Sequence, residues 1–219
     1  GSAKFGIDVQ VPGMVYASIL QSPMEGAKPK EGGVNIPDVM KVKGVSKVIP
    51  LPFGVAVIGD SVEATRSGVE ALKVTWDTSG ATAAGFDSEK AKVDYAAKGK
   101  DPNVETKVEY QVGDAKAGLG GAAKTVEAAY WTEYTYHAQM EPMNAVAQVS
   151  EDGKSADIWT GTQFGALAAG ILSGILKTTP DKIRVHQQFL GGGYGRRIWP
   201  DAAIQATILS NITKKPVKL

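Results

Sequence analysis

The stretch that decides the fold is Phe189-Leu190-Gly191-Gly192-Gly193-Tyr194-Gly195-Arg196-Arg197, which follows the alternating run of residues 183–187. Four glycines in five positions remove nearly every Cβ atom, so the backbone can adopt positive φ angles and lie directly against a ligand. Successive N–H groups in such a turn form a concavity that binds anions, and the two arginines add forked cationic donors. Two interpretations remain open from the residues alone. The loop either borders a cofactor or phosphate, or is a tight turn in which glycine only relieves strain.

A second pattern precedes this loop. Gln163 follows Thr162 and leads into an apolar run of small residues, 166–176, which predicts a buried helix. Residues 177–182 have the composition of a turn and lead back into the strand before the glycines. This order, Thr-Gln, helix, strand and Gly-Gly-Gly-aromatic-Gly, resembles the molybdenum-binding subunit of the xanthine oxidase family.

Within that family the loop is most similar to the large (beta) subunit of the isoquinoline 1-oxidoreductase type, where it ends in Arg-Arg. Relatives of the xanthine dehydrogenase type continue Gly-Gly-Gly-Phe-Gly-Gly-Lys-Glu. This chain has Arg196, Arg197 and Ile198 at the last three positions. The glutamate of that branch is absent, so the resemblance gives no support for purine recognition.

The resemblance covers nearly the whole chain. The run of residues 4–17 is similar to the opening of the family's α/β-hammerhead domain, and residues 137–142, His-Ala-Gln-Met-Glu-Pro, are similar to its His-x-x-Met-Glu-Pro element. Each match is short, but all of them occur in the family's order. We therefore expect an α+β fold made of a hammerhead unit and the N-terminal part of a molybdopterin-binding domain.

Composition sets the outer bounds. The 219 residues are 43% hydrophobic and 21% charged with a net charge of +1, which favours neither nucleic acid nor an anionic membrane as a partner. The longest apolar stretch is too short to span a bilayer, so no membrane insertion is expected from this segment. There is no cysteine, which excludes disulfides and cysteine-ligated metal or iron–sulfur centres within the chain. With two histidines, His137 and His186, a histidine-rich metal site is not expected either.

Periodicity and turn chemistry predict the local elements. Asp60 or Ser61 is expected to cap a helix, and Asp152-Gly153 to form the turn of a hairpin. Mixed strands and helices without strict βαβ alternation indicate α+β rather than a doubly wound sheet. The expected strands are residues 14–20, 45–51, 55–58, 73–77, 125–134, 144–149, 156–160 and 183–187, and further helices are expected at 86–98 and 113–123. We expect three parts: a hammerhead-like domain over 1–78, a linker with short helices over 79–124, and a partial molybdopterin-binding domain over 125–219.

The candidate cofactor-binding residues are Gln163, the loop residues 191–195, and the two arginines that follow. A side-chain amide can donate one hydrogen bond and accept another. The resemblance implies that Gln163 donates to an oxygen ligand of molybdenum, whereas the alternative is a polar residue near a helix start. It also implies that the Tyr194 N–H faces the metal's oxo group, with an aromatic packing anchor as the alternative.

Charged residues nearby leave two readings each. Arg196 and Arg197 could hold cofactor phosphates or a substrate anion, because guanidinium forks match such oxygens, or they could be solvated or structural. Glu141 could be a general base or a structural hydrogen-bond acceptor. We expect no metal ligand among these side chains.

The resemblance implies a parent enzyme that hydroxylates N-heterocycles or oxidises aldehydes with oxygen from water. Its cofactor would be molybdopterin, in the cytosine dinucleotide form, and its partner an iron–sulfur small subunit. The family's catalytic glutamate lies in a Gly-x-Gly-Glu element near the subunit's C-terminus, which this chain lacks. We therefore expect a piece of a longer subunit that carries part of the cofactor wall, has no catalytic residue, and is inactive and without cofactor in isolation.

Two alternatives and one open question accompany this reading. The chain could be a non-catalytic interaction domain, or its loop could be a dinucleotide fingerprint. The fingerprint Gly-x-Gly-x-x-Gly starting at Gly191 would need glycine or alanine where Arg196 stands. The compartment stays open between a bacterial cytoplasm and periplasm, with the resemblance slightly favouring the periplasm.

Overall fold

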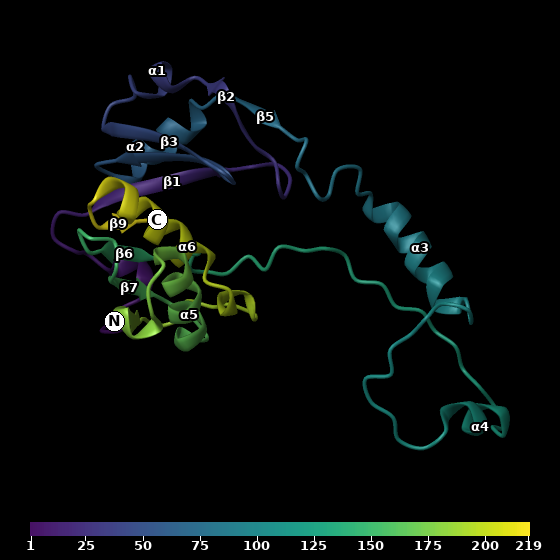
Figure 1. Ribbon diagram of the computed structural model, residues 1–219. Helices are drawn as coiled ribbons and strands as arrows, with labels where there is room; N and C mark the ends of the chain where they lie inside the picture. Colours follow the sequence, from purple (N-terminus) through teal and green to yellow (C-terminus); the bar gives the residue numbers. More distant parts are fainter. The chain divides into compact units, whose positions relative to one another are not determined.

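The computed structural model describes all residues, 1–219, and its contacts divide the chain into two units (Figure 1). The first unit combines Gly1–Thr82 with Tyr136–Leu219, and the second is Ala83–Thr135. The first unit holds both sheets and the four helices α1, α2, α5 and α6. Its strands are β1 (Val15–Gln21), β2 (Lys28–Val34), β3 (Val45–Leu51), β4 (Gly54–Gly59), β5 (Val74–Asp77), β6 (Val146–Val149), β7 (Ala156–Thr160), β8 (Ile183–Gln187) and β9 (Val217–Lys218). Its helices are α1 (Ile36–Val39), α2 (Val62–Glu70), α5 (Gly165–Leu176) and α6 (Asp201–Thr213).

One seven-stranded sheet runs through the first unit in the order β3-β4-β1-β9-β6-β7-β8, and β2 pairs with β5 in a separate antiparallel sheet. The C-terminal strand β9 lies beside β1, to which it is parallel, and is antiparallel to β6 (Figure 1). Two residues of β9 thus join the N-terminal strands to the later ones in a single sheet. Whether the parts bounded at residues 78 and 124 fold separately stays a prediction.

Helix α6 links the core on both sides of this junction. Its N-terminal half contributes Ala202, Ala203 and Ala206 to a cluster with β6, β7, β8 and α5. Its later residue Leu209 belongs to a second cluster with β1, β3, β4 and β9. Helix α6 therefore contributes to two apolar clusters, one on each side of the junction made by β9.

Strand β4 is buried along its whole length because both of its faces are covered. Val55 and Val57 pack in a cluster with α1, whereas Ala56 and Ile58 pack in the cluster that contains Leu209. A continuous apolar run, rather than strict alternation, is the pattern expected of such a strand.

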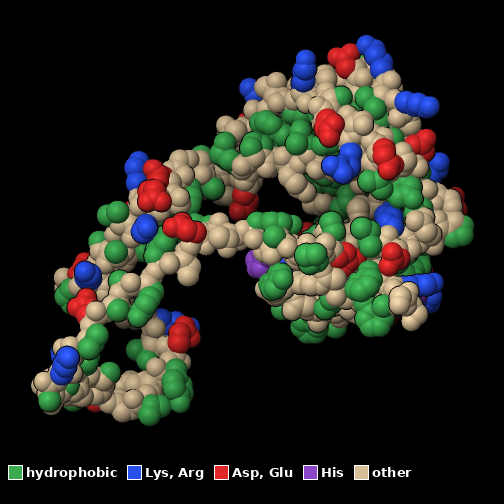
Figure 2. Space-filling view, turned by 180° about the vertical axis from the view of Figure 1, so that it is seen from behind, with side chains coloured by type: hydrophobic (Ala, Val, Ile, Leu, Met, Phe, Trp, Pro, Cys, Tyr) green, Lys and Arg blue, Asp and Glu red, His purple; other side chains and the backbone are tan.

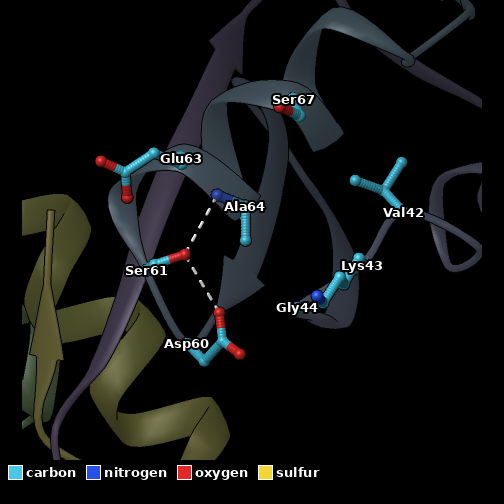
Figure 3. Close-up of a pocket in the computed structure, with 8 residues that line it drawn as sticks. All are labelled: Val42, Lys43, Gly44, Asp60, Ser61, Glu63, Ala64 and Ser67. Carbon is cyan, nitrogen blue, oxygen red and sulfur yellow. Dashed lines mark hydrogen bonds between the residues drawn. The ribbon is translucent and has the colours of Figure 1, made fainter.

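Helix α2 begins as its sequence predicts. The Ser61 hydroxyl accepts a hydrogen bond from the Ala64 N–H at 3.2 Å and donates to Asp60 Oδ1 at 3.1 Å (Figure 3). An N-terminal cap of this kind satisfies one of the amide groups that the first helical turn leaves without a partner. Of the two expected caps, Ser61 is the one that acts.

The second unit contains α3 (Ser88–Lys100) and α4 (Ala115–Gly120). Both helices were predicted, and each is capped by an aspartate, Asp87 and Asp114. The predicted strand over residues 125–134 is wrong, because residues 124–139 form neither helix nor strand. The apolar alternation is present there, but a strand needs a partner to complete its hydrogen-bond ladder, and no segment of the unit supplies one.

The α+β class is confirmed, and so is the predicted hairpin turn, where Gly153 has a φ of +73°. The elements that were not predicted include α1, β2 and α6. None of the helices is both long enough and apolar enough to cross a membrane. On the face shown in Figure 2, acidic and basic side chains are interspersed over the larger unit, in keeping with the near-zero net charge.

Candidate functional site

The glycine loop takes an unusual backbone path after β8. Gly192 and Gly195 have φ angles of +87° and +90°, which glycine adopts without a steric cost. Tyr194 also lies in the left-handed region, with a φ of +52°, although its side chain is bulky. The residue is 75% exposed, so side-chain packing does not hold it in this conformation. Strain of this kind, roughly 1–3 kcal/mol, tends to persist at functional sites.

Four amide groups of this loop have no acceptor within the protein: the N–H groups of Gly192, Gly193, Tyr194 and Gly195. The carbonyl oxygens of Gly193 and Gly195 accept from the turn that follows, at 2.8 and 3.4 Å. The loop therefore satisfies these two acceptors internally and leaves consecutive donors free. Consecutive free N–H groups are the arrangement that binds anionic or oxo groups.

Gln163 lies directly beside this loop. Its backbone N–H donates to the Arg197 carbonyl at 3.1 Å, and its side-chain Oε1 accepts from the Arg197 N–H at 3.1 Å. A Cβ atom added to Gly193 would lie 3.6 Å from the same Oε1 atom. The structure thus brings together Gln163 and the loop, which the sequence analysis selected as separate candidates. The Gln163 side chain is exposed, and its Nε2 group has no acceptor in the protein, so it adds one more free donor.

Glu141 and Arg197 form a buried ion pair behind the loop, with 8% and 1% of each residue exposed. Arg197 Nη2 lies 3.0 Å from Glu141 Oε2 and also donates to the Glu141 carbonyl at 2.6 Å. The carboxylate accepts further bonds from the N–H groups of Ile7 and Gly191 and from the Asn144 side chain, at 3.0 to 3.1 Å. Of the two readings of Glu141, the structure supports the hydrogen-bond acceptor.

The two arginines are placed differently. Nε and Nη2 of Arg197 are engaged inside the protein, so this residue contacts the loop from behind. Arg196 forms an ion pair with Asp201 at the start of α6, with about a third of its side chain exposed. Arg196 lines a hollow of about 540 Å³ together with Gln21 and Gln205. Its fork is therefore partly accessible, whereas that of Arg197 is not.

An apolar hollow of about 410 Å³ adjoins the first glycines of the loop. It is lined by Phe5, Ile7, Met140, Glu141, Pro142, Gly191 and Gly192. The N-terminal segment that forms one side of it is held by Lys218, whose ammonium group donates to the carbonyls of Ile7 and Val9 at 2.5 and 3.0 Å. Burial lowers the pKa of Lys218, and the nearby Asp8 opposes this shift. Sequence reasoning did not find this contact, because the groups lie more than 200 residues apart along the chain.

Another hollow, of about 640 Å³, lies elsewhere, between the first turn of α2 and the loop 42–44 (Figure 3). Its capping groups, Asp60 and Ser61, bond to each other and to the helix. We therefore place the candidate site at the glycine loop, where donors remain free.

The fold defined by these elements is that of a known class of protein. The aldehyde oxidoreductase from Desulfovibrio gigas superposes with a TM-score of 0.70 over 100% of this chain and 28% of that chain, at 17% sequence identity. Residues 97–219 match the family model described as the molybdopterin cofactor-binding domain, and the chain belongs to that family.

Several curated relatives match along the whole chain, and two of them are described here. The isoquinoline 1-oxidoreductase subunit beta of Brevundimonas diminuta is 33% identical over 100% of this chain and 28% of its own length. A membrane-bound aldehyde dehydrogenase [pyrroloquinoline-quinone] of Gluconacetobacter polyoxogenes is 30% identical over 100% of this chain and 29% of its own length. The resemblance read from the loop and its flanking motifs is confirmed. The chain spans less than a third of either relative.

The donors at the loop fit the group that the family binds. Molybdopterin carries phosphate and metal-bound oxygens, which accept hydrogen bonds, and the free groups of Gly192 to Gly195 and of Gln163 all donate them. A Cβ atom at Gly192 or Gly195 would also be strained by the positive φ.

Proposed function

We propose that this chain forms one wall of the cofactor site in a molybdenum hydroxylase subunit. The observation that carries the proposal is a loop with four free N–H groups and an exposed tyrosine in a strained conformation, placed beside the free amide of Gln163. Such groups gain hydrogen bonds when an acceptor-rich ligand arrives, and they need no rearrangement to do so.

The residues of this chain would bind and orient the cofactor. The N–H groups of Gly192 to Gly195 and Gln163 Nε2 hold acceptor oxygens, and Gly191 allows the loop to approach Glu141 closely. The bound cofactor supplies the redox chemistry. Arg196 has a partly exposed fork that suits a phosphate at the edge of the site. A proton-accepting base would come from a Gly-x-Gly-Glu element outside these residues, since Glu141 is fully engaged in the loop's support.

The substrate class is an N-heterocycle or an aldehyde, oxidised with oxygen from water. The names of the relatives include both chemistries. We further propose the cytosine dinucleotide form of the cofactor, an iron–sulfur small subunit as the partner through which electrons leave, and the bacterial periplasm as compartment, all on family resemblance. Residues 1–78 would be the hammerhead domain, 79–124 a connection, and 125–219 the first part of the cofactor-binding domain.

Replacing Gln163 in the complete subunit tests the proposal. Gln163→Ala removes one preorganised donor, which typically costs about 10²- to 10³-fold in kcat. The side chain is exposed and its hydrogen bond to the protein comes from the Arg197 N–H, so the free energy of unfolding should fall by no more than about 1.5 kcal/mol. Gln148→Ala on β6, an exposed glutamine on another part of the sheet, is the matched control and should leave kcat unchanged. Unchanged turnover in Gln163→Ala would contradict the cofactor role.

Identifying the cofactor distinguishes molybdopterin from the pyrroloquinoline-quinone that the name of one relative contains. Mass spectrometry of the group released from the complete subunit should give a molybdopterin. Release of the quinone named for the Gluconacetobacter relative would contradict the proposal.

A further inference from the structure

We propose that Glu141 and Arg197 are positioning residues that fix the glycine loop in its donor-presenting conformation. The effect of the pair on catalysis rests on the proposed function. Its role in fixing the loop rests only on the contacts of the two residues. Both side chains are buried and bond to the loop's backbone, so they act through that backbone.

The pair holds the loop at two consecutive residues. Glu141 brackets Gly191: the Gly191 N–H donates to Glu141 Oε2 at 3.1 Å, and the Glu141 N–H donates to the Gly191 carbonyl at 2.9 Å. Arg197 fixes the next residue, because its Nε donates to the Gly192 carbonyl at 2.6 Å. These bonds occupy the Gly191 N–H and the carbonyls of Gly191 and Gly192. The N–H groups from Gly192 onward stay free to bind a ligand.

The backbone of Arg197 also holds Gln163. The backbone of Arg197 exchanges two hydrogen bonds with Gln163, one to its N–H and one to its side-chain Oε1. Holding Oε1 orients the amide so that Nε2 is the end left free. One buried arginine thus sets the position of the loop and of the neighbouring amide donor together.

Charge explains why both residues are needed. A buried ion loses its hydration, and removing one partner of a buried pair leaves an uncompensated charge, which is strongly destabilising. Replacing both partners by neutral side chains of similar size can instead be close to neutral for stability. Stability and loop position can therefore be separated by comparing single and double variants.

The test is ¹⁵N relaxation of the 219-residue chain, with thermal unfolding measured in parallel. The variants are Arg197→Met, Glu141→Gln and the double variant that combines them. Arg196→Met is the matched control, since this arginine pairs with Asp201 and its side chain makes no hydrogen bond to the loop. In the unsubstituted chain and the control, the amides of residues 192–195 should have order parameters of about 0.85, the value of a rigid backbone.

The single variants should unfold at lower temperature than the double variant. In Arg197→Met and in the double variant, the order parameters of residues 192–195 should fall below about 0.6, because the Gly192 carbonyl has lost its donor. A double variant that regains both thermal stability and a rigid loop would overturn the proposal and make the pair merely structural. A rigid loop in Arg197→Met would overturn it as well. The relaxation measurement needs no cofactor, so its failure would leave the proposed function standing, and failure of the Gln163→Ala test would leave this inference standing.

Discussion

Alanine substitutions at three glycines of one loop should have three different costs. A Cβ atom added to Gly191 would lie 2.2 Å from the Cβ of Glu141 and 2.9 Å from its Oε2. The clash is with an atom next to the backbone, and that backbone is itself bonded to Gly191, so neither side can move freely. Overpacking of this kind costs about 1–3 kcal/mol, and we expect the upper end for Gly191→Ala.

The other two positions isolate the remaining effects. A Cβ atom added to Gly195 would meet no neighbour, but the residue has a φ of +90°. Gly195→Ala should therefore be destabilised only by the strain of the left-handed backbone, about 1–2 kcal/mol. Gly193 has no positive φ, and its nearest neighbours, side-chain atoms of Arg197 and Gln163, lie at 3.5 to 3.6 Å, which is ordinary contact. Gly193→Ala should therefore change stability by less than about 1 kcal/mol in either direction.

Thermal unfolding of the three variants measures this order directly. For a chain of this size, 1 kcal/mol corresponds to about 2–4 °C, so Gly191→Ala should lower the melting temperature by about 6–12 °C. Gly195→Ala should lower it by about 2–8 °C, and Gly193→Ala should stay within about 4 °C of the original. A neutral Gly191→Ala, or a Gly193→Ala as damaging as Gly191→Ala, would refute the described packing of the loop on Glu141.

Two further predictions concern other parts of the chain. In α2, Gly68→Ala should destabilise the protein, because the added Cβ would lie 2.6 Å from Val57 Cγ1. In α5, the Cβ added by Gly170→Ala meets no atom within 4 Å, so this variant should stabilise the protein by about 0.5–1 kcal/mol. Urea denaturation of both variants measures the two effects, and equal effects would contradict the described helix packing. Limited proteolysis should cut first within Ala83–Thr135, which contains long irregular segments and exposed apolar side chains, and first cleavage inside β1 to β4 would contradict this expectation.

Local chemistry decided which elements could be predicted from the sequence. The Ser61 cap and the Asp152-Gly153 turn depend on neighbouring residues alone, so their signals were readable. Helix α6 was missed because residues such as Ala202, Ala206 and Leu209 are buried against both halves of the sheet. A helix covered on most sides lacks a clear amphipathic period. Strand β2 was missed because its sequence, Lys-Pro-Lys-Glu-Gly-Gly-Val, is poor in strand-forming residues.

In the candidate site too, residues in local motifs could be selected from the sequence, whereas contacts between distant residues could not. The sequence could select Gln163 and the loop 191–195 as candidates because each lies within a short motif, and the out-and-back path of α5 and β8 brings them together. Their role in cofactor binding stays a prediction. The Glu141–Arg197 pair joins residues 56 positions apart, and no local pattern in one sequence indicates that an acid and a base so distant will meet. The alternatives weighed for Glu141 and Arg197 could be separated only by their burial and contacts.

The most direct test of the cofactor-wall proposal is a structure of the complete subunit with its cofactor bound. Gln163 Nε2 and the Tyr194 N–H should each lie about 2.7–3.2 Å from an acceptor oxygen of the same bound cofactor. A cofactor bound at another surface, with Gln163 and the glycine loop both turned to solvent, would contradict the proposed role of this loop.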